Sequence, residues 1–415
     1  MTYFNAVKYI SAAPEANVTA ESGILRLLSR LNNPQRRMKY IRLAGSNGKT
    51  VCAEMLISVL TKAKYTVGTL RMPLRDEPRE NICIGDKFLD MDEFSNYIEE
   101  IKYTASEKWC ADNDEPSPLT LTKSEIILSA AILAFSRHKC ELCIIESDHF
   151  GEDPSKHLLP PFAAIICGTI PNDDTAEISR IRSYICRGIQ EIVSAPQNSE
   201  AYRIISDTCY SINCRLTLPS RNSIGIRRLT FRGTDFVYKG KGYSLKMCGR
   251  FQISNAVLVL EAIEMLIRKG FKISDQSILE GLESTHIPAK FEIVSLSPLI
   301  IVDSTHTPIA VDTVCDSLMD FRDLSGSKIR LCLPDKDLVD IYISALEARG
   351  YSIERIISSD GNYSDLTCEA IVCKTKKALV KRSLEDLNKD TVLLISGDYP
   401  FVNSVRYELL ATMGF

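Results

Sequence analysis

A glycine-containing turn between an apolar run and an amphipathic segment constrains this chain more than any other feature of its sequence. The run at 39–44 is typical of a short buried strand, and residues 49–64 have the spacing of an amphipathic helix. Between them, residues 45–50 read Gly-Ser-Asn-Gly-Lys-Thr. A Gly-Lys-Thr sequence that follows a strand and opens a helix is typical of a phosphate-binding loop. The segment therefore predicts a nucleotide-binding α/β protein.

The residue types in this turn suit the phosphates of ATP. Glycines let the backbone turn tightly enough to point N–H groups at phosphate oxygens, and the start of the helix adds a partial positive charge. Lys49 would reach the β- and γ-phosphates as a point charge, and the Thr50 hydroxyl would bind Mg²⁺. The alternative is a glycine turn in which Lys-Thr occurs by chance. The residues expected to bind the nucleotide here are Gly45, Ser46, Asn47, Gly48, Lys49 and Thr50.

Apolar runs alternate with helical patterns along the chain, which indicates an α/β fold. A helix at 124–137 precedes a strand at 142–146, and a further strand is expected at 162–168. Strands separated by helices predict a parallel sheet that is covered on both faces. The alternating pattern at 224–248 instead favours a small antiparallel insert, which a long helix at about 253–269 follows.

A second α/β series begins near residue 291 and predicts a second domain. A chain of 415 residues is also too long for one ordinary core. We therefore expect an ATP-binding domain at 1–287 and a second α/β domain at 288–415. Helical patterns separate the strands expected in the second domain, at 299–302, 329–333, 353–358 and 392–396.

Charge and hydropathy argue against two classes of partner. The formal net charge of −3 argues against nucleic acid, whose binding proteins are basic. The chain begins with no secretory pattern, and no apolar stretch approaches the roughly 18–20 residues of a membrane span. We therefore expect a cytoplasmic protein with no membrane partner. The 14 cysteines include a CxxC at Cys140–Cys143 but no second pair at zinc-ribbon spacing, which predicts free, mostly buried thiols.

Several motifs, in the same order along the chain, resemble those of folylpolyglutamate synthases in the Mur ligase superfamily. The loop at 45–50 and the Asn32-Asn33-Pro34-Gln35 segment before it resemble the opening of the family. The run Ile144-Ile145-Glu146 resembles the family's strand that ends in a glutamate holding Mg²⁺. Further motifs that resemble the family's are Arg79-Glu80-Asn81-Ile82, Gly249-Arg250-Phe251-Gln252-Ile253-Ser254-Asn255-Ala256, Pro288-Ala289-Lys290-Phe291-Glu292, Asp303-Ser304-Thr305-His306-Thr307-Pro308, Asp335-Lys336-Asp337 and Gly397-Asp398.

The resemblance implies a Mur-ligase architecture, with a P-loop central domain and a Rossmann-like C-terminal domain. It also implies ATP-dependent amide-bond formation, in which ATP phosphorylates a carboxylate and an amino group, typically of glutamate, attacks the acyl phosphate. Lys49 and Mg²⁺ would neutralise phosphate charge, and Glu146 would hold Mg²⁺ together with Thr50. The implied partners are a small-molecule carboxylate acceptor and an amino acid.

Residues further along the chain would complete the nucleotide site. Gln252 and Asn255 belong to the motif of the helix beside the nucleotide. Closure of the C-terminal domain would bring Lys290, Asp303 and His306 to the nucleotide and exclude water. Asp303 would contact the ribose and His306 the phosphate region, although a histidine after a strand is also compatible with a purely structural role.

Several departures from the family pattern fall on its metal and substrate chemistry. The family's Mg²⁺-binding serine corresponds to Met72, and methionine is a poor ligand for a hard cation. A metal-ligating histidine of the family corresponds to Asp174. The lysine that the family carbamylates corresponds to Cys186, which cannot be carbamylated in that way. The glycine-rich segment after the glutamate is largely lost at 147–153.

Two interpretations follow from these departures. In the first, the chain is a divergent ligase of the folylpolyglutamate synthase type, in which another acidic residue, Asp174 among them, holds the metal. The acidic residues between 148 and 174 permit this, although a solvated acidic loop has the same composition. In the second, ATP binding survives without ligation, and the protein is a scaffold or regulatory partner of an active ligase. The intact Lys49, Thr50 and Glu146 favour the first interpretation. Other metal ligands considered in it are Asp148, His149 and Asp173.

Overall fold

The structure is a computed structural model that describes residues 1–15, 23–45, 47–72, 77–106, 118–147, 159, 161–170, 180, 184–185, 188–321, 324, 327–361, 363 and 368–414. The chain divides into two compact units. The first comprises Met1–Pro219 and Asn255–Gly281, and the second comprises Ser220–Ser254 and Leu282–Phe415. The sequence interpretation set its domain boundary between 287 and 288, and that boundary stays a prediction.

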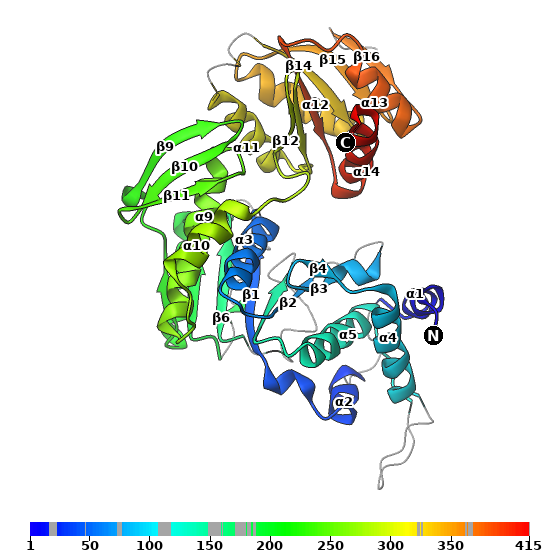
Figure 1. Ribbon diagram of the computed structural model, residues 1–415, viewed down its shortest axis with the longest axis vertical. Helices are drawn as coiled ribbons and strands as arrows, with labels where there is room; N and C mark the ends of the chain where they lie inside the picture. The colour runs from blue at the N-terminus through cyan, green and yellow to red at the C-terminus, as the bar shows by residue number, and fades with distance from the viewer. Residues whose placement is uncertain are drawn as a thin grey trace. The chain divides into compact units, whose positions relative to one another are not determined.

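The first unit is built on a mixed sheet in which parallel pairs dominate (Figure 1). The strand order is β4-β3-β2-β5-β1-β6-β7-β8, so β5 lies between β2 and β1. Only the edge strands β3 and β4 pair in the antiparallel sense among the described strands of this sheet. Its strands are β1 (Lys39–Gly45), β2 (Val67–Arg71), β3 (Ile82–Ile84), β4 (Lys87–Phe88), β5 (Leu142–Glu146), β6 (Ala163–Cys167), β7 (Glu191–Ser194) and β8 (Arg215–Thr217).

Strand β5 shows why the sequence signal for this sheet is strong. All of its residues, Leu-Cys-Ile-Ile-Glu, are buried, as is usual for a parallel strand with helices on both faces. Glu146, the last residue of β5, is its only charged member. Parallel pairing sets Glu146 opposite Leu43 of β1 and opposite Arg71 of β2. The carboxyl ends of these three strands therefore meet at one edge of the sheet.

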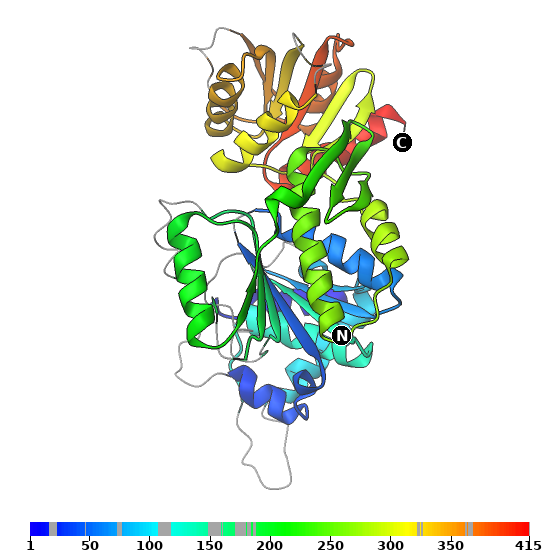
Figure 2. The same ribbon diagram turned by 90° about the vertical axis from the view of Figure 1, so that its left-hand side faces the viewer.

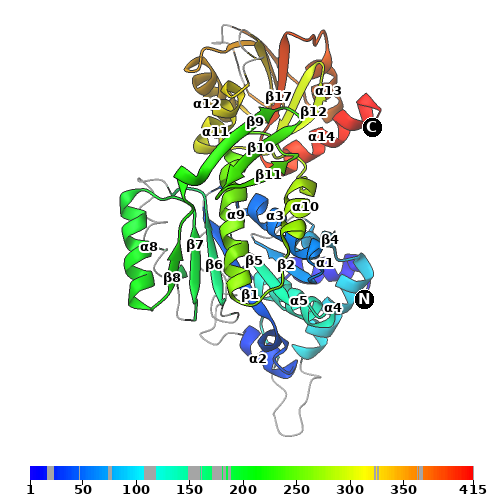
Figure 3. The ribbon, with the colours of Figure 1, turned by 60° about the vertical axis from the view of Figure 1, so that its left-hand side comes forward.

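Helices cover both faces of the first sheet. Figures 2 and 3 show α8 on one face of the strands, and Figure 2 shows α3 and α9 on the other. Helix α5 begins at a capping box, in which Thr122 and Glu125 each accept a hydrogen bond from the other's backbone N–H group. The helices of this unit are α1 (Tyr3–Ser11), α2 (Gly23–Arg30), α3 (Lys49–Lys62), α4 (Met91–Thr104), α5 (Lys123–Arg137) and α8 (Ser199–Ser211), with most of α9 (Arg250–Arg268) and α10 (Asp275–Ser284).

Side-chain alternation along β2 decides which residues face α3. Leu70 joins the apolar cluster that α4 and α5 cover, and the ring of Phe135 packs against the Cα of Gly68. Successive side chains on a strand point to opposite faces, so Thr69 and Arg71 face α3 instead. The same face carries Glu146, because Cys143 and Ile145 belong to the cluster on the other side.

The second unit contains the antiparallel insert that the alternating pattern predicts. Three strands form it, in the order β11-β10-β9, with bounds β9 (Ile224–Thr230), β10 (Gly233–Tyr238) and β11 (Lys241–Leu245). Both neighbouring pairs are antiparallel. The apolar faces of this insert and of the larger sheet share a core, in which the rings of Phe231 and Phe321 stack with centroids 4.0 Å apart.

The larger sheet of the second unit has the order β12-β13-β17-β14-β15-β16. Strand β12 pairs antiparallel with β13 at one edge, and the other described pairs are parallel. Its strands are β12 (Glu292–Leu296), β13 (Leu299–Asp303), β14 (Lys328–Leu333), β15 (Ser352–Ser358), β16 (Glu369–Val372) and β17 (Thr391–Ser396). Its helices are α11 (Pro308–Met319), α12 (Lys336–Glu347), α13 (Lys376–Leu384) and α14 (Tyr399–Met413).

The structure confirms two expectations about the chain as a whole. Two α/β units with parallel-dominated sheets are present, as the sequence predicts. The cysteines that the structure describes are free thiols, and all of them except Cys368 are buried. Among the described helices, none is long and apolar enough to cross a membrane.

Candidate nucleotide site

The turn after β1 has a backbone conformation that requires glycine at two positions. Gly45 has a φ of +125° and Gly48 a φ of +81°, in the region that L side chains avoid. A Cβ atom at Gly45 would lie 1.9 Å from the carbonyl oxygen of Cys167. A Cβ atom at Gly48 would lie 2.5 Å from Oδ1 of Asn255. The turn is therefore packed tightly against β6 and against the side chain of Asn255.

The first residues of α3 place an ammonium group and a hydroxyl group beside this turn. Lys49 Nζ donates a hydrogen bond of 2.7 Å to the carbonyl oxygen of Gly45, so the side chain folds back over its own loop. Thr50 Oγ1 donates a hydrogen bond of 2.5 Å to Oε1 of Glu146. Gly48 is the N-cap residue of this helix, and as a glycine it has no side chain to cap the first N–H groups. Uncapped N–H groups at a helix N-terminus attract anions.

Glu146 is the acidic member of this group. Its side chain is buried at the end of β5, and Oε2 accepts no hydrogen bond from the described residues. The guanidinium of Arg71 forms an ion pair with that oxygen, with its Nε 3.6 Å away. A buried carboxylate oxygen that lacks a hydrogen bond carries a large desolvation penalty unless a cation compensates it.

The sequence does not single out Arg71, because the family resemblance at this strand end concerns only Met72 and the two residues after it. The guanidinium of Arg71 forms an ion pair with Glu54, which lies one turn into α3, and its Nη1 lies 3.1 Å from the thiol of Cys83. Burial alone would lower the pKa of Arg71, but Cys83, Glu54 and Glu146 raise it above its usual value. The group therefore stays cationic.

Asn255 is the residue of α9 that the structure brings to the phosphate turn. Its Oδ1 lies against Gly48, and the thiol of Cys52 lies 3.8 Å from its carbonyl oxygen. Gln252 is fully buried in the first turn of α9 and belongs to the second unit. Where the family has histidine in this motif, Phe251 instead packs edge-on against Phe291, with ring centroids 6.0 Å apart.

In the second unit, Asp303 is a buried carboxyl group at the end of β13. Its Oδ2 accepts a hydrogen bond of 2.6 Å from the N–H of Phe291, and its Oδ1 accepts none from the described residues. Burial raises the pKa of Asp303, although Lys290, Thr305 and the Phe291 N–H partly oppose the shift. His306, three residues later, is exposed.

The backbone around Lys290 is unusual. Ala289 and Phe291 have φ values of +56° and +52°, and both side chains are buried. The family motif has glycine where this chain has Ala289, so the turn has kept a glycine-like conformation without the glycine. Lys290 itself is half-buried.

The late motifs of the sequence analysis lie at the carboxyl edge of the second sheet but act as structural caps. Asp335 accepts a hydrogen bond from the N–H of Leu338 at the start of α12, and Asp398 accepts one from the N–H of Phe401 at the start of α14. The neighbouring Ser396 is likewise bonded within the unit, since it donates to the carbonyl oxygen of Thr305.

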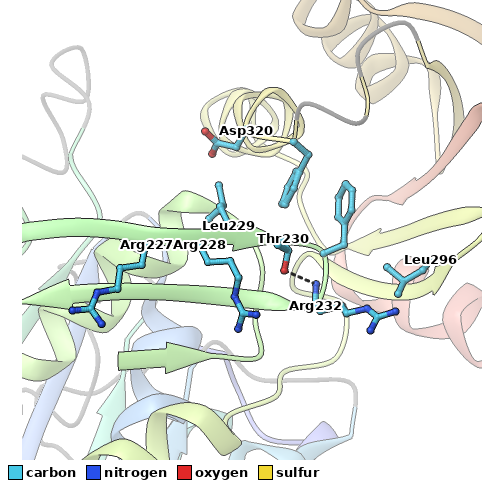
Figure 4. A pocket seen from close by; sticks show the side chains of 9 residues that line it. Arg227, Arg228, Leu229, Thr230, Arg232, Leu296 and Asp320 are labelled. Carbon is cyan, nitrogen blue, oxygen red and sulfur yellow. Dashed lines mark hydrogen bonds between the residues drawn. The ribbon is translucent and has the colours of Figure 1, made fainter. Parts of the chain in front are cut away.

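A hollow of about 830 Å³ lies in the second unit (Figure 4). Arg228 on its wall pairs with Asp235, and Asp320 pairs with Arg250, so these charges are compensated inside the unit. Its lining residues include none of the predicted nucleotide-binding residues and are Arg227, Arg228, Leu229, Thr230, Phe231, Arg232, Leu296, Asp320 and Phe321.

Some predicted site residues lie outside the described residues. They are Ser46 of the turn, Asp174 as a metal ligand, the alternatives Asp148, His149 and Asp173, and Cys186. Among the residues that the structure describes, no group of three or more His, Cys, Asp and Glu side chains is placed to hold a metal ion.

The described residues nonetheless fit Mg²⁺ at one point. The Thr50 hydroxyl and the Glu146 carboxylate are hard oxygen donors in direct contact, and Glu146 keeps a buried oxygen without a hydrogen bond. Mg²⁺ commonly takes only one or two protein ligands and completes its shell with phosphate oxygens and water. Thr50 and Glu146 would hold the ion, whereas the thioether of Met72 would not.

Comparisons with known proteins connect this geometry to one group of enzymes. The folylpolyglutamate synthase of Lacticaseibacillus casei is 23% identical over 351 residues, which cover 81% of this chain and 81% of that protein. A probable bifunctional folylpolyglutamate synthase/dihydropteroate synthase of Halobacterium salinarum is 25% identical over 312 residues. That match covers 71% of this chain but only 37% of the bifunctional protein. No family model matches the chain.

The fold has close counterparts among solved structures. Folylpolyglutamate synthase of Mycobacterium tuberculosis, solved in complexes with ADP and AMPPCP, aligns with a TM-score of 0.77. The alignment has 18% sequence identity and covers 98% of each chain. At this identity the likeness establishes the architecture of both units.

Proposed function

We propose, from the premise that this chain is a folylpolyglutamate synthase-like protein of the Mur ligase superfamily, that it is an ATP-dependent ligase forming an amide bond. Its substrates are small molecules, a carboxylate acceptor and an amino acid, and we propose glutamate as the amino acid. A cytoplasmic location is part of the proposal, because a reducing compartment suits the free thiols of the described chain.

One observation carries this proposal. The glycine turn, the Lys49 ammonium, the Thr50 hydroxyl and the buried Glu146 carboxylate are assembled at the carboxyl edge of a parallel sheet. Ligands of open α/β sheets bind at this edge. Phosphoryl transfer depends mainly on positioning and on neutralising negative charge, and these groups supply both. ATP and Mg²⁺ are accordingly the cofactors that we propose for the site.

The reaction balances with these participants. A carboxylate oxygen of the acceptor bonds to the γ-phosphorus of ATP, and the bond between that phosphorus and the bridging oxygen breaks, which releases ADP. The amino group of glutamate then bonds to the acyl carbon, inorganic phosphate leaves with the electron pair, and the amine releases a proton. Lys49 would hold the phosphates in line, and bound Mg²⁺ would add neutralising charge to them.

Phosphate release tests the proposal. Purified protein is incubated with ATP, Mg²⁺, glutamate and a panel of carboxylates that includes folate. Release of phosphate that requires both the acceptor and the amino acid is the expected result, and Lys49→Ala, prepared in parallel, controls for contaminating ATPases. If calorimetry shows that ATP binds but no acceptor yields ADP, the ligase proposal is wrong.

The alternative is a catalytically impaired ATP-binding homologue that acts as a scaffold or regulatory partner of an active ligase. The relatives favour the ligase over this alternative. Two departures from the family favour impairment: the Mg²⁺-binding serine is replaced by Met72, and the carbamylated lysine is replaced by Cys186. Cys186→Lys separates the two: an increase in turnover would show that this residue limits a reaction the protein performs, whereas turnover absent from both proteins would support the scaffold.

A further inference from the structure

The edge of the first sheet holds a buried cation that the phosphate turn itself does not explain. The side chain of Arg71 is only 9% exposed and lies between two carboxylates, Glu54 of α3 and Glu146 of β5. Its position is fixed further by its place at the end of β2, where the side chain of Asn81 donates a hydrogen bond of 2.6 Å to the Arg71 carbonyl oxygen. The guanidinium is thus part of a built arrangement.

We propose that the Arg71 guanidinium is a resident cation of the phosphate site, which compensates Glu146 when Mg²⁺ is absent and lets the site bind nucleotide phosphates with little dependence on Mg²⁺. The inference rests on the proposed function only in taking the ligand to be a nucleotide. It concerns binding and is independent of whether amide bonds form.

The contact between Arg71 and Glu146 is close enough for charge compensation but leaves Glu146 able to bind a metal. At 3.6 Å the Nε···Oε2 pair is an ion pair and exceeds the distance of a normal hydrogen bond. Oε2 therefore keeps its lone pairs, while Oε1 is bonded to Thr50. Glu146 has its compensating charge before any metal arrives.

Met72, the residue after Arg71, also indicates that the end of β2 supplies a positive charge and no metal ligand. Met72 is half-buried and packs against the apolar cluster on the far side of the sheet, and its backbone N–H donates to the Glu146 carbonyl oxygen. A thioether offers no hard oxygen ligand. The end of β2 therefore contributes fixed positive charge through Arg71 in place of a metal ligand.

A fixed cation at this point also opposes free Mg²⁺. Two positive charges that share one carboxylate repel each other strongly in a buried site. We therefore expect Mg²⁺ alone to bind weakly, and Mg²⁺ to enter with the nucleotide, whose phosphates add negative charge.

Calorimetry on the intact protein tests the proposal. ATP is titrated in excess Mg²⁺ and again in EDTA, and the two dissociation constants are expected to agree within roughly tenfold. A loss of more than about tenfold on removing Mg²⁺ would overturn the Arg71 proposal and leave the ligase proposal intact. Absence of ATP binding in both conditions would overturn the proposed function as well.

Variants assign the effect to Arg71. In Arg71→Met, ATP binding is expected to become strongly Mg²⁺-dependent, with a loss of roughly 100-fold in EDTA and a much smaller loss in Mg²⁺. Arg71→Lys keeps the charge and is expected to preserve most binding in EDTA. Arg79→Met is the matched control, since Arg79 donates to the carbonyl oxygen of Leu89 in the same unit and contacts neither Glu54 nor Glu146. Equal Mg²⁺ dependence in Arg71→Met and wild type would contradict the proposal, and the wild-type titration decides the matter if Arg71→Met fails to fold.

Discussion

At the carboxyl edge of the first sheet, charged side chains are buried next to one another, whereas at the carboxyl edge of the second sheet most polar side chains cap helices or bond within the unit. Glu146 and Arg71 belong to the first group, and Asp335 and Asp398 to the second. Both sheets have the same parallel-dominated construction. The two units therefore share the sheet architecture and differ in the partners of the side chains at this edge.

Asp303 is the exception in the second sheet. It is a buried carboxyl group like Glu146, and it too has one oxygen that accepts no hydrogen bond from the described residues. Unlike Glu146, it has no arginine within ion-pair distance among the described residues. This difference predicts that the two carboxyl groups respond differently to substitution.

The largest effect is expected in the second unit and on stability alone. Arg330 is fully buried and makes a bidentate pair with Glu354, with both N···O distances 2.9 Å, and its Nη1 also donates to the carbonyl oxygen of Ser383. Arg330→Met would leave these acceptors without their donor, and we expect a loss of about 3–5 kcal/mol in the free energy of unfolding, measured in urea. A loss below about 1 kcal/mol would show that the second unit depends less on this internal pairing than the contacts indicate.

The next effect falls on ligand affinity in the first unit. Lys49→Ala removes the ammonium that lies over the turn, and we expect ATP to bind on the order of 100-fold more weakly by calorimetry. The thermal midpoint of the ligand-free protein should change little, because the lost hydrogen bond to Gly45 is only partly buried. Unchanged ATP affinity would break the assignment of this edge to phosphate binding.

A smaller effect depends on pH. Burial holds the pKa of Asp303 above its ordinary value of 3.8, so the folded state retains a proton that the unfolded state loses. The contribution of Asp303 to the free energy of unfolding is therefore fully present below its ordinary pKa. This contribution is lost as the pH rises through the raised pKa of the folded state. Asp303→Asn should remove this fall, with a gain of about 1–2 kcal/mol at neutral pH and none at low pH.

Denaturant titrations of wild type and Asp303→Asn at several pH values measure this difference. A variant that is less stable than wild type at neutral pH would show that the charge of Asp303 is well compensated inside the second unit. Asp303 and Glu146 would then not differ in how well their charges are compensated.

The smallest effect concerns the backbone beside Lys290. Ala289 has a φ of +56°, which glycine adopts without the steric penalty of a Cβ atom. We expect Ala289→Gly to raise the free energy of unfolding by about 1 kcal/mol, partly offset by the greater freedom of glycine in the unfolded chain. Thermal unfolding measures this effect. Clear destabilisation would mean that the buried methyl group of Ala289 contributes more to the free energy of unfolding than the backbone strain takes away.

The sequence predicted the elements whose signals are local. The phosphate turn, β5 and four strands of the second sheet, β13, β14, β15 and β17, stand out because parallel strands are apolar runs bounded by helices. Strands β12 and β16 of that sheet are not among the predicted ones. The sequence does not indicate strand β2, since it is short and contains Gly68, a residue type that is depleted in strands. Gly68 is explained only by the ring of Phe135, which leaves no room for a Cβ atom.

The role of Arg71 could not be read from the sequence for a similar reason. An arginine at the end of a strand usually lies in solvent. Its two acidic partners are 17 and 75 residues away along the chain, and only the parallel pairing of β2 with β5 and the packing of α3 bring them together. Alternation along β2 would have provided the signal, had the strand been recognised.

The hydrogen bond from Lys49 to the carbonyl oxygen of Gly45 affects the rate, the entropy and the enthalpy of ligand binding. A lysine that is immobilised only on binding gives up roughly 1.5–2 kcal/mol of rotamer entropy at that moment. Here the Lys49 side chain is already ordered in the folded protein, so an arriving phosphate meets an ammonium group that is in place. The ammonium then exchanges the carbonyl oxygen of Gly45 for a phosphate oxygen as its hydrogen-bond acceptor. Binding of the phosphate should therefore show a small entropic penalty and a modest enthalpy. Its rate should depend on how often Lys49 Nζ leaves the carbonyl oxygen of Gly45.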